Sequence, residues 1–173
     1  AGDKNFQAFG GGGGGGGDGL LLYGSGVEVN NLGGTIAGGA GGAGGDANVP
    51  GGAGEAGAGV RALGVDLSLI NLGMISGGAG TGTGVAGIGV ITQGFSSIQN
   101  GGTIEGGLTG SARASAILFQ GANNTLTMVA GSAIHGAVEV ADGSNAQAGA
   151  VDNAMIEEVK LDGSTAAIDL SAA

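Results

Sequence analysis

The chain contains one histidine, His135, and no cysteine. His135 is therefore its one side chain that ordinarily titrates near neutral pH, suited to act as a general base or an imidazole metal ligand. In the repeat described below it directly follows an inward-facing isoleucine, Ile134, so we expect it to point outward. No G-x-S-x-G turn accompanies it. The sequence predicts a solvated surface histidine, no catalytic residue and no enzymatic activity.

Two short glycine motifs match known binding sequences. Residues 82–87 fit the dinucleotide fingerprint G-x-G-x-x-G, and residues 13–21 fit one calcium-binding nonapeptide through Asp18 and Leu20. No helical pattern follows the first, and no second nonapeptide follows the second. In a chain with 46 glycines among 173 residues we interpret both as chance matches and expect no cofactor.

The last part of the chain is rich in acids, whose oxygens can surround a hard cation such as Ca²⁺. Their spacing fits no known calcium loop, so a role in solubility is favoured and no metal site is predicted. The acids in question are Glu139, Asp142, Asp152, Glu157, Glu158, Asp162 and Asp169.

Composition excludes several classes of function. A net charge of −10 repels nucleic acid and anionic lipid, and no apolar run reaches the ~20 residues of a membrane-spanning helix. We expect neither a nucleic-acid partner nor membrane insertion. The mean hydropathy of +0.34 indicates a buried core, but 4 Phe, 1 Tyr and no Trp indicate a thin one built from small side chains.

Internal repeats must position His135 and the other candidate residues. Similar phrases stand at residues 31–39, 71–78 and 100–107, with a degenerate copy at 131–136. They share an anchoring isoleucine, at Ile36, Ile75, Ile104 and Ile134. The first three also share an asparagine, Asn31, Asn71 and Asn100, which we expect to form a structural ladder of stacked amides at a turn.

Two further short strands are predicted upstream of each anchor, because apolar residues alternate there with polar ones. The repeat places Met128 in the same column as Ile98, with Thr127 beside Ser97. Three short strands per repeat describe one coil of an all-β, parallel β-solenoid with glycine-rich loops between the coils. The expected inward residues are Val29, Ile36, Val60, Leu69, Ile75, Val90, Ile98, Ile104, Ile117, Phe119, Met128 and Ile134.

We divide the chain into a glycine-rich N-terminal segment or cap (residues 1–19), regular coils (20–136) and an irregular acidic terminal coil or cap (137–173). In the longest loop, residues 38–59, glycine recurs at every second or third position. This spacing favours a loop laid against its neighbours, and disorder is the alternative.

The N-x-G-T-I-x-G-G phrase, the GGAGGAGG spacer and residues 121–132 (GANNTLTMVAGS) resemble passenger domains of bacterial autotransporter adhesins. The resemblance covers residues 10–140. It implies a right-handed β-helix that is secreted or displayed on the bacterial cell surface.

Three roles remain open at this point. The favoured one is an extracellular structural or adhesive stalk, cut from a larger adhesin. The second role is a filament subunit. The first residues, Ala1, Gly2 and Asp3, fit a terminus left by signal-peptide removal. The whole chain would then be a subunit that joins head to tail into a filament through its open ends. The third role is an adhesin tip that binds a ligand or glycan on a host or neighbouring cell.

Overall fold

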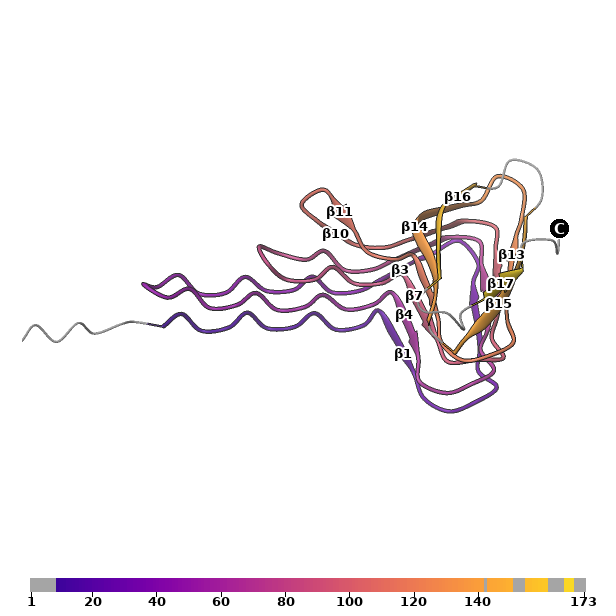
Figure 1. Cartoon of the computed structure of the whole chain (residues 1–173), viewed down its shortest axis with the longest axis horizontal. Helices are drawn as coiled ribbons and strands as arrows, with labels where there is room; N and C mark the ends of the chain where they lie inside the picture. The colour runs from indigo at the N-terminus through magenta and orange to yellow at the C-terminus, as the bar shows by residue number, and fades with distance from the viewer. Residues whose placement is uncertain (1–8, 142, 151–154, 162–166, 170–173) are drawn as a thin grey trace, which may run out of the picture.

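The computed structural model describes residues 9–141, 143–150, 155–161 and 167–169. Strands follow one another along this part of the chain, and none of its segments is helical (Figure 1). Accordingly, it offers no helix long and apolar enough to cross a membrane. The predicted all-β class with parallel strand pairing is confirmed.

The strands form three parallel stacks around one core. The first stack holds β1 (Leu20–Leu22), β4 (Val60–Ala62), β7 (Val90–Thr92), β12 (Ile117–Phe119) and the second half of β14 (Ala133–Val140). The second holds β2 (Glu28–Asn31), β5 (Ser68–Asn71), β8 (Ser97–Asn100), β13 (Asn124–Met128), β15 (Asn145–Ala150) and β17 (Ala167–Asp169). The third holds β3 (Thr35–Ala37), β6 (Met74–Ser76), β9 (Thr103–Glu105) and the first half of β14.

Two elements stand outside this order. β16 (Met155–Leu161) runs beside both halves of β14, and β10 (Leu108–Thr109) and β11 (Ala112–Arg113) form a small antiparallel hairpin.

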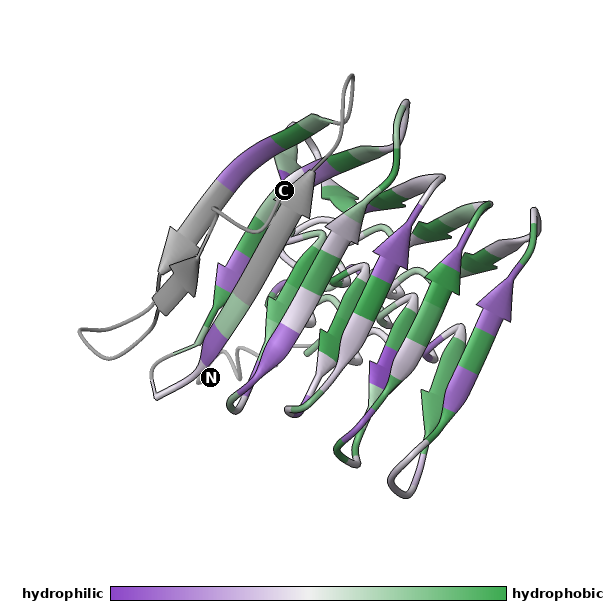
Figure 2. Ribbon diagram, turned by 90° about the vertical axis from the view of Figure 1, so that its right-hand side faces the viewer, coloured by the Kyte–Doolittle hydropathy of each residue, from purple (hydrophilic) through white to green (hydrophobic). Residues whose placement is uncertain are grey.

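The pairing register places like side chains above one another. Ile36, Ile75, Ile104 and Ile134 form one continuous column, as the repeat predicted. Apolar and polar positions alternate along the strands (Figure 2). All the expected inward residues are buried except Val29 and Ile36, which are half-buried because, among the described strands, those of the first repeat pair on one side only. Each buried Val, Leu or Ile stabilises the fold by about 1.5–3 kcal/mol.

The fourth repeat departs from the predicted column by two residues. Ile98 pairs with Leu126, not with Met128, and Met128 lies over Asn100; likewise Thr125, not Thr127, lies over Ser97. The cause is a longer turn, since residues 129–132 connect β13 to β14 where 101–102 connect β8 to β9. A shift of two residues keeps the same face inward, so Met128 is still fully buried.

β14 passes from the third stack to the first without leaving the body of stacked strands. Gly136 makes this bend with φ +102°, and a Cβ there would lie 2.5 Å from the Ala114 carbonyl oxygen. The strand register shifts between Ile134 and Ala137. In the earlier repeats the same corner carries a long excursion instead of a bend.

These excursions form what we call the glycine wing, made of residues 9–19, 38–59, 77–89 and 106–116. It extends to one side of the body as a set of wavy segments that shorten along the chain (Figure 1). Outgoing segments, such as residues 38–46, continue the third stack, and incoming segments, such as 9–19 and 49–59, lead into the first.

Candidate functional site: the glycine wing, its groove and the asparagine ladder

Backbone hydrogen bonds join the wing segments at every third residue. The N–H groups of Gly10, Gly13, Gly16 and Gly19 donate to the carbonyl oxygens of Val49, Gly52, Glu55 and Ala58 over 2.8, 2.8, 2.8 and 2.9 Å. Those of Gly39, Gly42 and Gly45 donate to Gly17, Gly14 and Gly11, and those of Gly51, Gly54 and Gly57 donate to Gly45, Gly42 and Gly39. A period of three is that of polyproline II-type backbone, which bonds to neighbouring chains because it has no internal hydrogen bonds.

The same period fixes where glycine is required. A Cβ on Gly54 would lie 2.1 Å from the Gly14 carbonyl oxygen, and a Cβ on Gly13 would lie 2.0 Å from that of Gly42. Both obstacles are backbone atoms that themselves belong to the hydrogen-bonded array. Gly52, in contrast, has nothing within 4 Å of its ideal Cβ. Residues 38–59 are thus packed against their neighbours, and one residue in each turn meets a carbonyl oxygen so closely that a Cβ cannot fit.

A groove lies in the angle between the wing and the first stack. It has a volume of about 460 Å³, which is within the usual range of small-molecule sites. Glu55, Val85 and Ile88 line it from the wing, and Ile91 and Leu118 line it from the body. A smaller hollow of about 240 Å³ shares Val85 and lies next to Arg113.

The charged groups at the groove are largely paired. Arg61 Nε lies 2.8 Å from Asp18 Oδ2, and the backbone N–H of Ala58 donates to Asp18 Oδ1 over 2.7 Å. Partial burial alone would raise the pKa of the Asp18 carboxyl, but the hydrogen bonds from Arg61 and Ala58 outweigh it and hold the pKa below its ordinary value. Ser115 donates to Glu139 over 2.6 Å. Among the described residues, Glu55 makes no ion pair and leaves an exposed carboxylate at the groove.

The three asparagines of the predicted ladder lie in one column of the second stack. Asn31 Nδ2 donates to Asn71 Oδ1, and Asn71 Nδ2 donates to Asn100 Oδ1, each over 2.8 Å. Each side chain also accepts from, and donates to, the backbone of its own turn. The series ends at Met128, whose sulfur lies 3.9 Å from Asn100 Nδ2.

His135 lies on β14 with its side chain one-third exposed, and it does not line the groove. Its Nδ1 is 2.8 Å from Glu157 Oε1 on β16, and the N–H of Gly136 donates to Glu157 Oε2 over 2.7 Å. The hydrogen bond with His135, helped by that from Gly136, lowers the pKa of the Glu157 carboxyl. Arg113 and Glu105 form a separate ion pair of 3.3 Å nearby.

The remaining sequence motifs do not meet in one place. Residues 82–87 lie in the wing excursion formed by residues 77–89, and Asp18 of the nonapeptide match is bound by Arg61. Of the tail acids, Asp142, Asp152 and Asp162 lie outside the described residues. Within the described part of the chain, no three His, Cys, Asp or Glu side chains gather as a metal site would require.

The glycine spacing correctly predicted that residues 38–59 lie against their neighbours, but sequence reasoning foresaw neither the groove nor the backbone hydrogen bonds at every third residue. The signal was present as glycines spaced by three, at Gly38, Gly41 and Gly44 and again at Gly51, Gly54 and Gly57. Each of these glycines meets a carbonyl oxygen closely enough to exclude a Cβ. The groove had no such signal, because its walls come from segments far apart in the sequence.

Comparisons of the chain with protein-family models, with curated proteins and with solved structures gave no significant match.

Proposed function

We propose that the chain is a right-handed parallel β-solenoid with an extracellular structural and adhesive role, a stalk-like element of a bacterial surface similar to an autotransporter passenger domain. Parallel pairing of each repeat with the next supports the solenoid, as does the recurrence of Ile and Asn in single columns. Such stacked repeats make a spacer whose length grows with the number of repeats.

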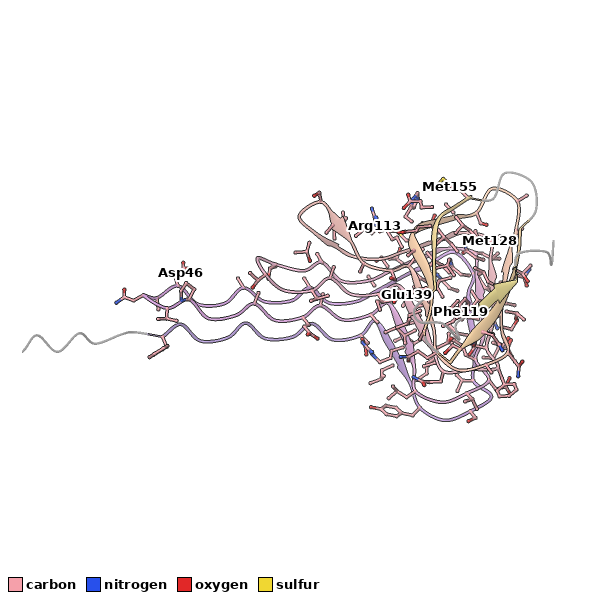
Figure 3. The ribbon with its side chains drawn as sticks, in the orientation of Figure 1. Asp46, Arg113, Phe119, Met128, Glu139 and Met155 are labelled. Carbon is pink, nitrogen blue, oxygen red and sulfur yellow. The ribbon has the colours of Figure 1, made fainter. Side chains whose placement is uncertain are left out.

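The packing of the glycine wing is the observation that carries the structural role. Its segments are joined through backbone N–H and carbonyl groups at regular intervals, so the wing holds its shape without large side chains. Figure 3 shows how few side chains it carries compared with the body, where Phe119 and Met128 lie. Recognition surfaces usually depend on Trp, Tyr or Arg anchors. A wing built from Gly and Ala therefore favours support over specific recognition.

Labelling of intact source cells tests this role. Antibodies raised against the purified chain are expected to label unbroken cells, and protease added outside the cells is expected to remove the label. Labelling that appears only after lysis would contradict an extracellular stalk.

Ligand recognition is the second candidate function, and the groove between wing and body favours it. Its apolar walls and the exposed Glu55 carboxylate suit a small amphipathic ligand, glycans included. A glycan array probed with the wild-type chain, with Val85→Arg to fill the groove, and with Gln99→Arg on the exposed face of β8 distinguishes the two roles. Tight binding lost only in Val85→Arg would establish recognition, and uniform absence of binding would leave the stalk.

The proposal assigns no reaction to the chain. His135 pairs with Glu157 on the outer surface, and neither lines the groove. A hydrolytic activity of the purified chain that His135→Ala abolishes would contradict the proposal.

A further inference from the structure

The first repeat lies at one edge of the described strand stacks. In the described part of the chain β1, β2 and β3 each pair on one side only, and wing residues 10–17 continue this edge outward. Leu20, Leu22, Val29 and Ile36 pack against the core from this repeat but stay half-buried. We call residues 10–37 the N-terminal edge.

Wing residues 10–17 contain more glycine than their own packing requires. A Cβ on Gly13 or Gly16 would lie 2.0 Å from a carbonyl oxygen, whereas a Cβ on Gly11, Gly14 or Gly17 would meet nothing within 4 Å. The next excursion carries Ala40, Ala43 and Asp46 at its exposed positions. The first run has no side chain at any position, including those where this chain leaves room for one.

The backbone of this run also has unused hydrogen-bonding groups. Within the part of the chain that the structure describes, the N–H groups of Gly11, Gly12, Gly14 and Gly15 donate no hydrogen bond. Interior wing segments contact one another through backbone N–H and carbonyl groups at glycines that lack a Cβ. Glycine backbone with unpaired N–H groups is therefore what a further polyproline II-type segment needs in order to pack closely.

Nothing in the sequence protects this edge from association. Exposed strand edges usually carry Lys, Pro or inward charges that oppose pairing. Residues 9–37 contain no Lys, Arg or Pro, and of their two acids Asp18 is neutralised by Arg61. Despite the net charge of −10, two such edges meet with little charge repulsion beyond Glu28.

We propose that the N-terminal edge binds the same edge of a second copy of this chain, forming a closed two-fold dimer. A binding partner for this edge must present polyglycine backbone next to three strand edges. The N-terminal edge of a second copy presents both. Residues 9–19 already bind one neighbour in parallel (49–59) and another antiparallel (38–46), so the packing admits either relative direction. The described residues at the opposite end offer no such match, because none of them after residue 116 belongs to the wing.

This arrangement differs from the head-to-tail contact expected from the sequence, which generates open filaments. When the N-terminal edge binds the same edge of a second copy, both edges are buried in the dimer and no further copy can add there. The inference needs only the fold and is independent of the proposed surface location.

Analytical ultracentrifugation of the full 173-residue chain over a wide concentration range tests the inference. The wild-type chain is expected to show a monomer–dimer equilibrium and no larger species. Gly14→Glu places a carboxylate at the joint, where it meets its symmetry mate, and is expected to weaken dimerisation about 100-fold or more while leaving the melting temperature of the monomer unchanged.

Gln99→Glu is the control, since it adds the same charge to the exposed face of β8, and two strand pairings separate β8 from the edge strand β2. It is expected to dimerise as the wild type does. A wild-type chain that stays monomeric at every concentration would overturn the inference. So would growth into long fibres, or dimerisation of Gly14→Glu at wild-type strength.

Discussion

Asn71 occupies the middle of the asparagine ladder, fully buried and bonded on both sides. Replacement by Ala would leave Asn31 Nδ2 and Asn100 Oδ1 without these partners. We expect Asn71→Ala to lower the free energy of unfolding by about 2–4 kcal/mol. Asn30→Ala is the control, because the exposed Asn30 side chain bonds only Glu28 among the described residues; it should change stability by no more than about 0.5 kcal/mol. Equal effects in chemical denaturation would refute the ladder's structural role.

The Asp18–Arg61 pair gives a prediction about pH. The hydrogen bonds from Arg61 and Ala58 lower the pKa of the folded Asp18 carboxyl from its unfolded value. Its ionised form therefore contributes stability that is fully present above the unfolded pKa and is lost as the pH falls through the folded pKa. Asp18→Asn is expected to cost about 1 kcal/mol near neutral pH, since the pair is partly exposed. The difference between wild type and variant should disappear in strong acid. A difference that persists unchanged at low pH would contradict this assignment.

Residue roles could be predicted from sequence only where the repeat supplied a column. The asparagines recur before the first three anchoring isoleucines, so their stacking could be inferred without coordinates. The partner of His135 could not, because Glu157 comes from a strand of the irregular last part of the chain, where no repeat fixes the register.

Among the elements, the wing has the most regular chemistry, and a pair of glycines in one segment tests it. Gly54→Ala places a methyl group 2.1 Å from the Gly14 carbonyl oxygen and is expected to cost about 2 kcal/mol or more. Gly52→Ala meets nothing and should stabilise the chain by up to about 1 kcal/mol, because alanine restricts the unfolded state. Thermal melts of the two variants check this. Similar melting temperatures would mean that the segments are not packed as described.

The strands were easier to predict than the wing for a physical reason. Period-two alternation of side chains marks a half-buried strand directly. A wing segment buries its backbone, so its sequence is marked only by a lack of large side chains. Flexible glycine-rich linkers have the same composition. The spacing of the glycines by three distinguishes the two cases, as at Gly51, Gly54 and Gly57.

At the scale of the whole molecule, the repeat order followed from the sequence except where a turn changed length. Counting back from Ile134 misplaced Met128 because the extra residues lie in the turn at 129–132 and not upstream of the strand. The inward face survived this error, since side chains alternate with period two. Where the wing joins the body, no single segment determines the geometry, so the groove became visible only in three dimensions.

The central claim is that a stacked β body supports a wing held together by backbone hydrogen bonds of period three. Residue-resolved amide hydrogen exchange tests it most directly. We expect slow exchange at Gly39, Gly42 and Gly45 and at Gly51, Gly54 and Gly57, whose N–H groups are bonded, and fast exchange at Gly52, whose N–H group donates no hydrogen bond within the described part of the chain. Uniformly fast exchange across residues 38–59, at a pH where the strands β4 to β9 are protected, would contradict the account.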